Sequence, residues 1–302
     1  MAPSAARTRT VATGLLVLLT AVWGSTFFLI RDLLVTLPAT DFLAVRFAIA
    51  AVLMLAIFGR HVRRLDRREW VVGLSLGAVY GVAQILQTIG LATTDASVSG
   101  FITGTYVVLT PVFSALLLRE RLPAVTWAAV ALAAGGLAVL SLRGGLGIGV
   151  GEGLTLACAA VYALHIIGLG RWSTPSRATG LAAVQMVAIA VVSVVSALPG
   201  GIALPSGGGQ WTAVLYMATA AGVAALWIQS WAQARMTATR AAIVMTLEPV
   251  FAAFFAVVAG QEGLTWRMAV GGVLVLTAMY LVELRGRRRD APPSEALHHE
   301  VT

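Results

Sequence analysis

The chain has 302 residues, of which 59% are apolar and 11% are charged, and its mean hydropathy is +0.88. Because soluble domains carry about 25% charged residues, this composition excludes a water-soluble globule, and most of the chain is predicted to lie in lipid. The formal net charge is +8, all 21 basic residues are arginine, and the single cysteine, Cys158, excludes a disulfide framework within one chain.

Ten segments are long and apolar enough to cross a hydrocarbon core of about 30 Å as helices, which takes about 17–25 residues. Lipid cannot satisfy exposed backbone groups, and the segments are too long and too uniformly apolar for barrel strands. The predicted fold class is therefore all-α, a polytopic membrane protein with ten transmembrane helices. The predicted spans are 12–30, 41–58, 72–91, 96–118, 124–142, 153–171, 178–198, 210–234, 238–259 and 264–284.

The two ends of the chain are interpreted separately. The first span follows Arg7 and Arg9, but it is longer than the core of a typical signal peptide and lacks a small-residue cleavage site. It is therefore interpreted as a helix of the mature protein. Residues 285–302 carry mixed charge and two prolines and have no apolar face, so they are predicted to form a disordered cytoplasmic tail.

The arginines predict the orientation, because cytoplasmic loops collect basic residues. If the connections alternate between the two faces, seventeen arginines lie on the face that holds the N-terminus and three on the other, while Arg46 lies inside the second span. Both termini are therefore predicted to be cytoplasmic, in a multi-pass protein of the cell membrane. This distribution explains the high pI, so no nucleic-acid partner is predicted.

The sequence contains an internal repeat. Residues 87–120 resemble residues 229–262, and both stretches contain Pro-Val-Phe, at Pro111 and Pro249. The spacing between equivalent residues is 142 in this region and 139 near the start of each half. The equivalent pairs are Gln87 and Gln229, Ala96 and Ala238, Glu120 and Glu262, Trp23 and Tyr162, and Arg46 and Gln185.

Each repeat unit is predicted to contain five spans, in residues 1–142 and 143–284. An odd number of crossings places the two units in opposite orientations in the membrane. Inverted repeats of this kind occur in many secondary transporters, whose substrate site lies between the units. The ten helices are therefore predicted to form two inverted five-helix repeats.

The chain resembles the EamA branch of the drug/metabolite transporter superfamily over residues 12–284. The resemblance rests on Ala21-Val22-Trp23-Gly24-Ser25, Arg46, Ala96-Ser97, the two Pro-Val-Phe runs, Glu120 and Glu262, in this order. The second half departs from the family pattern, because it has Tyr162-Ala163 in place of Trp-Gly and Gln185 in place of a basic residue.

The resemblance implies a central substrate cavity that is shared between the two halves and lined by the third, fourth and eighth helices. It also implies export of small metabolites, such as amino-acid-like or drug-like solutes, by alternating access. The expected partners are a small-molecule solute and the lipid bilayer, and no cofactor is predicted. The glycine pairs Gly135-Gly136 and Gly271-Gly272 are interpreted as helix packing or as the contact of a homo-oligomer.

Polar side chains recur at helical spacing in three spans, as Tyr80, Gln84 and Gln87 do at i, i+4 and i+7. They are interpreted either as the wall of a solute cavity or as hydrogen bonds between helices, which contribute about 0.6 kcal/mol each in membranes. The predicted substrate pathway comprises Trp23, Tyr80, Gln84, Gln87, Thr103, Tyr106, Thr110, Tyr162, His165, Trp227, Gln229 and Thr246.

Small residues and prolines are expected to shape the helices. Gly73, Gly77 and Gly81 form a small-residue face that is predicted to let the third and fourth helices approach closely. Pro111 and Pro249 interrupt the helical hydrogen-bond ladder near mid-membrane. They are interpreted as hinges for alternating access or as static kinks.

Two charges lie at membrane depth, where each costs at least about 2.5 kcal/mol unless it is paired or hydrated. Glu248 either lines the cavity and exchanges a proton during transport, or is a structural carboxylate that is hydrogen-bonded or paired to Arg46. Arg46 could instead extend toward the outer face. His165 is interpreted as a proton shuttle or as a hydrogen-bonded residue of the bundle, and no metal site is predicted because no ligand set has suitable spacing.

The sequence thus predicts a secondary transporter and no enzyme activity. An integral membrane enzyme or a membrane scaffold is the alternative, although the sequence has no nucleophile–base pair, no His-Glu zinc spacing and no acidic metal motif at a membrane boundary. The identity of the solute, the direction of transport and its coupling to protons or to exchange stay open.

Overall fold

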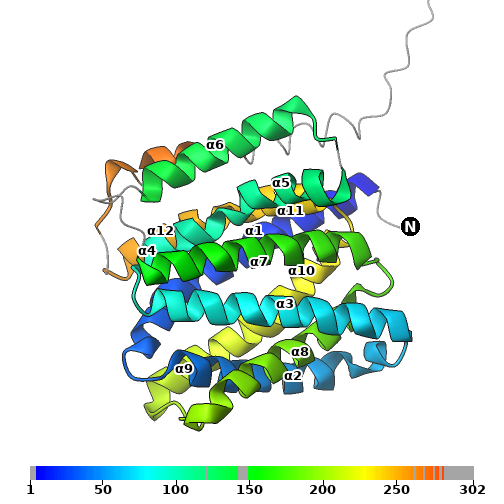
Figure 1. Cartoon of the computed structure of the whole chain (residues 1–302), viewed down its shortest axis with the longest axis vertical. Helices are drawn as coiled ribbons and strands as arrows, with labels where there is room; N and C mark the ends of the chain where they lie inside the picture. The colour runs from blue at the N-terminus through cyan, green and yellow to red at the C-terminus, as the bar shows by residue number, and fades with distance from the viewer. Residues whose placement is uncertain are drawn as a thin grey trace, which may run out of the picture.

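The computed structural model describes residues 5–119, 121–141, 149–260, 263–267, 269–274, 276–278 and 281. Over these residues the protein is helical and contains no strand (Figure 1). The helices are α1 (Ala5–Leu34), α2 (Ala39–Val62), α3 (Arg67–Leu91), α4 (Ala96–Gly104), α5 (Tyr106–Leu118), α6 (Ala124–Ser141), α7 (Val150–Trp172), α8 (Ala178–Ala197), α9 (Gly207–Ala218), α10 (Ala225–Gln233), α11 (Ala238–Met245) and α12 (Leu247–Val258), with the 3-10 turn η1 (Leu198–Gly200) and the π-helical segment η2 (Thr219–Ala224).

Eight helical runs of the described chain are long and apolar enough to cross a membrane, and they correspond to the first four and the sixth to ninth predicted spans. The fifth and tenth predicted spans coincide with shorter apolar helices, Ala124–Gly136 within α6 and Ala269–Ala278. The all-helical class is confirmed, while the ten-span arrangement remains a prediction. Glu120, Glu262, the repeat boundary at 142–143 and the predicted tail 285–302 lie outside the described residues.

Two of the long runs are interrupted helices. The first is α4 followed by α5, with a break at Thr105, and the second is α11 followed by α12, with a break at Thr246. At both breaks the threonine hydroxyl donates to the carbonyl three residues earlier, that of Ile102 at 2.6 Å and that of Ile243. Back-bonding of this kind competes with the helical ladder and bends the helix.

The interruptions do not coincide with the prolines that the sequence singles out as hinges. Pro249 follows Thr246 by three residues, where its ring and missing N–H oppose continuation of the preceding turn. Pro111 lies inside α5, which continues through it. In each half the helix is therefore broken at a threonine, and the proline follows at a different distance.

The eighth predicted span also departs from a regular α-helix, because η2 separates α9 from α10. A π-helical turn inserts extra backbone into the helix and often marks a functional site. The carbonyls of Met217, just before η2, and of Ala221, inside it, accept hydrogen bonds from side chains of α2 and α1.

Helices from the N-terminal part of the chain pack mainly on helices from the C-terminal part. The most extensive contacts join α2 to α8, α3 to α7 and α8, and α1 to α12, while α1, α2 and α3 touch one another much less. In Figure 1, α6 lies toward one end of the molecule and α2, α8 and α9 toward the other, with α7 between them. The two parts of the sequence are thus interleaved in one bundle.

The glycine face of α3 packs on α8. A Cβ on Gly77 would lie 2.4 Å from the carbonyl oxygen of Gln185, and Gly73 and Gly81 also face α8 side chains. The predicted close approach is present, but the helix that packs on the glycines is α8, which is the seventh predicted span. The prediction that they pack on the fourth span was wrong. The interleaving of the two parts places α8, which is distant in sequence, against this face.

Ion pairs join connections at the two ends of the bundle. Arg31, near the end of α1, lies 2.8 Å from the carboxylate of Asp95, just before α4. Arg177, before α8, lies 3.3 Å from the carboxylate of Glu69, which also closes a capping box with Asp66 at the start of α3. These side chains are partly exposed, so each pair contributes at most about 1 kcal/mol.

The packing of α3 on α8 predicts that Gly77→Ala lowers the stability of the protein. The added methyl group overlaps the backbone of α8, and overpacking of this kind costs about 1–3 kcal/mol. Gly135→Ala in α6 is the matched control, because no atom lies within 4 Å of a Cβ at that position. Thermal unfolding of the purified proteins in detergent should give a lower midpoint for Gly77→Ala alone, and equal midpoints would contradict the described packing.

Candidate functional site

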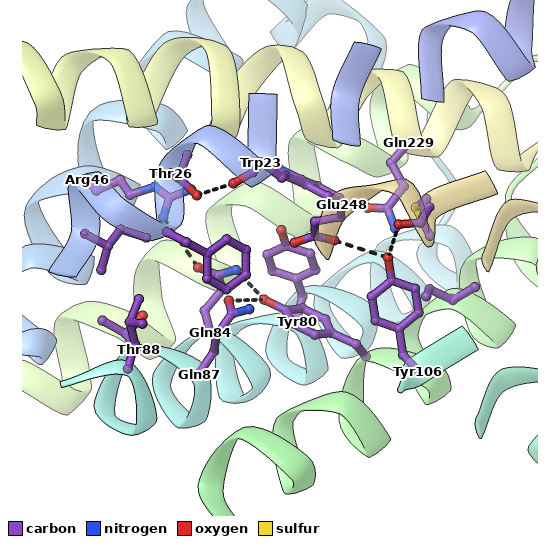
Figure 2. A pocket seen from close by; sticks show the side chains of 16 residues that line it. Trp23, Thr26, Arg46, Tyr80, Gln84, Gln87, Thr88, Tyr106, Gln229 and Glu248 are labelled. Carbon is purple, nitrogen blue, oxygen red and sulfur yellow. Dashed lines mark hydrogen bonds between the residues drawn. The ribbon is translucent and has the colours of Figure 1, made fainter. Parts of the chain in front are cut away.

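A pocket lies where helices from both parts of the chain meet (Figure 2). Its wall combines aromatic rings, amides, one arginine and one glutamate, as expected for a site that binds a small polar or amphipathic molecule. The lining residues are Trp23, Thr26, Phe27, Ile30, Arg46, Tyr80, Gln84, Gln87, Thr88, Leu91, Tyr106, Tyr162, Ile166, Gln229, Met245 and Glu248.

One wall of the pocket is a hydrogen-bonded chain of side chains. Arg46 Nη1 donates to Gln84 Oε1 at 3.5 Å, and the amide nitrogen of Gln84 donates to the Tyr162 hydroxyl. The Tyr162 hydroxyl donates to Gln87 Oε1 at 3.2 Å, and Gln87 Nε2 donates to Thr103 Oγ1 at 3.1 Å. This chain fixes the orientation of both α3 amides and links α2, α3, α7 and α4.

Arg46 is held inside the bundle. Its side chain is 3% exposed, its Nε donates to the Met217 carbonyl at 3.3 Å, and its guanidinium lies 4.7 Å from the centre of the Phe47 ring. The interpretation that it extends toward the outer face was therefore wrong. No carboxylate of the described residues lies within ion-pair distance of Arg46, so the suggested pairing with Glu248 is also absent.

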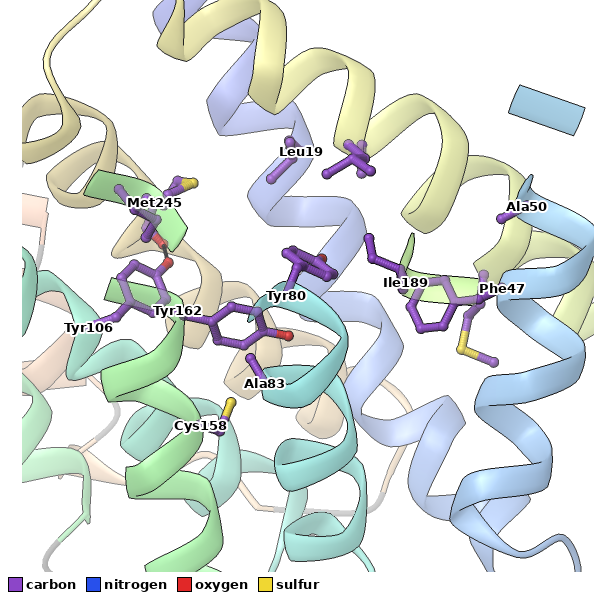
Figure 3. Close-up of a cluster of buried hydrophobic side chains, with 14 of the residues drawn as sticks. Leu19, Phe47, Ala50, Tyr80, Ala83, Tyr106, Cys158, Tyr162, Ile189 and Met245 are labelled. Carbon is purple, nitrogen blue, oxygen red and sulfur yellow. Dashed lines mark hydrogen bonds between the residues drawn. The ribbon is translucent and has the colours of Figure 1, made fainter. Parts of the chain in front are cut away.

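Glu248 is a second buried charge, toward the other side of the pocket in Figure 2. Its side chain is 6% exposed, and its Oε2 lies 3.1 Å from the Tyr106 hydroxyl. The same hydroxyl donates to the Met245 carbonyl at 2.8 Å. Figure 3 shows this bond beside the rings of Tyr80 and Tyr162. The sequence suggests two structural roles for Glu248, a hydrogen-bonded carboxylate or a carboxylate paired to Arg46, and the structure shows the hydrogen-bonded one.

Aromatic rings form the middle of the pocket. Tyr80 packs edge-to-face on Tyr162, with ring centroids 5.3 Å apart, and on His165, at 5.0 Å. Trp23 Nε1 donates to the Ala221 carbonyl of η2 at 3.1 Å, which fixes the indole of α1 against the eighth predicted span. Rings held in this way offer flat apolar surface between the two buried charges.

Nine predicted residues line the pocket, including both charges, and the others do not. Thr103 accepts the hydrogen bond from Gln87, His165 Nε2 lies 2.8 Å from Gln185 Oε1, and Thr246 forms the break in the ninth predicted span. Thr110 is fully buried and does not line the pocket. Pro111 and Pro249 do not line it.

Trp227 lies away from the pocket, although the sequence places it beside Gln229 on the predicted pathway. Its ring stacks on Phe58 with centroids 6.0 Å apart, and its Nε1 donates to Thr179 Oγ1 at 3.1 Å. The side chain therefore joins α10 to α2 and α8. The two residues are two apart on a helix, so their side chains point in different directions.

Seven residues that line the pocket are not part of the predicted pathway. Several follow a predicted residue at helical spacing, as Ile30 follows Trp23 by seven residues and Ile166 follows Tyr162 by four, so the helical period was a usable signal. Their apolar or small side chains do not stand out in a search for polar faces. They are Thr26, Phe27, Ile30, Thr88, Leu91, Ile166 and Met245.

Residues at equivalent positions of the sequence repeat meet in the pocket. Gln87 and Gln229, which are 142 residues apart, both line it, and so do Trp23 and Tyr162 at a spacing of 139. Tyr106 and Glu248, also 142 apart, touch each other. Arg46 breaks this pattern, because Gln185 at the equivalent position bonds to His165 outside the pocket.

Metal ligands do not gather in this site or elsewhere in the described ranges. Those residues contain no group of three or more His, Cys, Asp and Glu side chains that could hold a metal ion. The chemistry that the pocket offers is therefore hydrogen bonding, two buried charges and aromatic surface.

Comparisons with known proteins identify relatives over most of the chain. The model of the EamA-like transporter family matches residues 12–142 and again residues 149–284. A relative from Archaeoglobus fulgidus, named "Uncharacterized transporter", is 32% identical over 270 residues, which are 89% of this chain and 85% of the relative. A crystal structure of another protein, 21% identical, superposes with a TM-score of 0.75 over 93% of this chain and 99% of that one, so the two share a fold.

The geometry predicts that the pocket wall of α3 is accessible to water while its opposite face is not. In a chain that lacks Cys158, a cysteine at Gln84 should react with a small water-soluble thiol reagent at least about tenfold faster than one at Leu86, because only a hydrated thiol ionises readily. Leu86 is the matched position, on the same helix and packed against the apolar core. Equal reaction rates, measured by mass spectrometry of the modified protein, would rule out a hydrated pocket at Gln84.

Proposed function

The chain belongs to the EamA-like transporter family, and we propose that it is a secondary transporter that moves a small solute by exposing the pocket alternately to the two faces of the cell membrane. The observation that carries this proposal is the pocket between the two matched regions, in which Arg46 and Glu248 are buried without being paired to each other. Ionisable residues inside a membrane protein are costly and usually mark a substrate or ion pathway.

The proposed architecture is ten transmembrane helices in two inverted repeats, residues 1–142 and 143–284. The two family matches support it, as do the repeat-related residues on both sides of the pocket. The interrupted runs α4–α5 and α11–α12 also occupy equivalent places in the two repeats. Discontinuous helices that border a midplane site are typical of transporters built from inverted repeats.

The proposed orientation has both termini in the cytoplasm, and the proposed direction is export. The orientation is supported by the seventeen arginines that alternate topology assigns to one face. Export is inferred from the resemblance to metabolite exporters of the EamA branch.

The pocket chemistry favours a solute that has hydrogen-bonding groups at its ends and an apolar or aromatic body. Arg46 offers N–H donors, and Gln229 Oε1 is a buried acceptor without a hydrogen-bond partner in the described chain. Tyr80, Trp23 and Phe27 supply flat apolar surface near these groups. Amino-acid-like and drug-like molecules have this combination, so we propose them as the solute class.

Untargeted metabolite profiling of the culture medium tests the proposed function. Cells that overproduce the native chain should release at least one solute in excess over cells with an empty vector. Gln84→Ala removes a pocket amide and should reduce this excess about fivefold or more, the effect of one lost hydrogen bond. Val82→Ala is the matched control on the same helix, because Val82 is exposed on the outside of the bundle. Shortening this side chain should leave solute release unchanged.

Both variants must reach the membrane in amounts equal to the native chain. No excess solute from native cells, or the same excess from native and Gln84→Ala cells, would contradict the assignment of this pocket to transport.

A further inference from the structure

Tyr106 and Glu248 meet at the pocket wall, beside the break in the ninth predicted span. Tyr106 begins α5, and Glu248 follows the break at Thr246 by two residues. The Tyr106 hydroxyl lies 2.8 Å from the Met245 carbonyl oxygen and 3.1 Å from Glu248 Oε2. We propose that Tyr106 is a positioning residue that couples the protonation of Glu248 to the closure of this break, a role that rests on the proposed transport function.

Pro249 leaves the Met245 carbonyl without its helical partner. In a continuous helix the amide four residues later bonds this carbonyl, but residue 249 is proline and has no N–H. The Tyr106 hydroxyl donates to it instead, from another interrupted run (Figure 3). This bond therefore joins α5 to the last residue of α11.

The Tyr106 hydroxyl has one proton and two acceptor oxygens within reach. When Glu248 is protonated, its carboxyl group donates to the phenol oxygen while the phenol donates to the Met245 carbonyl, so both bonds form. When Glu248 is ionised, its carboxylate only accepts. Because a hydrogen bond to a charged acceptor is stronger than one to a neutral carbonyl, the phenol proton turns to Glu248 and the Met245 carbonyl loses its partner.

Glu248 is the carboxyl group of the pocket, and it exchanges its proton with water there, so no further reactant is needed. The permanent charge nearby is Arg46 on α2, and α1, α10 and α11 contribute no acid or base to the pocket wall. Tyrosine and cysteine ordinarily titrate above about pH 8, beyond the range of carboxyl groups. The titratable side chains that interact with Glu248 are Tyr106 on α5, Tyr80 on α3, and Tyr162 and Cys158 on α7.

Ionisation of Glu248 thus removes the hydrogen bond between α5 and α11, and protonation restores it. The released carbonyl lies at the point where α11 and α12 meet, next to residues of the pocket wall. Proton occupancy of the site is in this way linked to the freedom of one of the two interrupted runs to bend.

Amide hydrogen exchange of the full chain in lipid nanodiscs tests the coupling without a known solute. After correction for intrinsic rates, peptides that cover residues 238–252 should exchange about fivefold faster at about pH 8 than at about pH 5, the size expected for one hydrogen bond. Glu248→Gln should exchange slowly at both pH values, because its amide donates to Tyr106 as the protonated carboxyl does. Tyr106→Phe should exchange fast at both.

Tyr216→Phe is the matched control for the loss of a phenol hydroxyl. Tyr216 is hydrogen-bonded to Ser25 Oγ at 2.7 Å outside the pocket. This variant should therefore keep the native pH step, meaning the difference in exchange rate of residues 238–252 between the two pH values. A pH step that persists in Tyr106→Phe, or that is missing from the native chain, overturns the proposal. If Tyr106→Phe does not fold, Glu248→Gln decides alone, because a pH step that persists in Glu248→Gln also overturns the proposal.

The coupling and the transport function fail in different ways. Loss of the expected pH step while solute release continues rejects the coupling and leaves transport standing. A pH step with the expected variant pattern, together with no solute release, rejects transport and leaves the coupling as a property of the fold.

Discussion

A charge buried in an apolar bundle has to be compensated where it lies, and the helices around the pocket are arranged to do so. A charge at the membrane centre costs at least about 2.5 kcal/mol, whereas one hydrogen bond between membrane helices contributes about 0.6 kcal/mol. Arg46 therefore has several partners, the Met217 carbonyl, Gln84 and the Phe47 ring. Glu248 has Tyr106. The single bond of Glu248 falls short of the cost, which favours a polar occupant of the pocket, either water or solute.

Irregular backbone supplies the acceptors that hold the two parts of the chain together. Arg46, Trp23 and Tyr106, all from the N-terminal part, donate to three backbone carbonyls of the C-terminal part. Two of these carbonyls lie at or beside η2, and the third precedes the break at Thr246. Irregular backbone at membrane depth is tolerated where it lines a cavity. The helical defects are thus contact points around the pocket.

The sequence predicts the α3 wall of the pocket well, because the helical period alone places Tyr80, Gln84 and Gln87 on one face. It does not predict which face of α10 is turned inward. Trp227 and Gln229 are two residues apart on α10 and point in different directions, and the structure turns Gln229 to the pocket while Trp227 stacks on Phe58. The sequence also does not predict that the α3 glycines pack on α8, because the interleaving of the two parts depends on contacts between residues about a hundred positions apart.

Alternating access requires that one pocket is reached from both faces of the membrane in turn. A single cysteine at Thr88, which is buried and lines the pocket, can be exposed to a membrane-impermeant thiol reagent in sealed vesicles of right-side-out and inverted orientation, in a chain without Cys158. With alternating access, the reagent should modify this cysteine from either side. Modification from one side only, however long the exposure, would contradict alternating access.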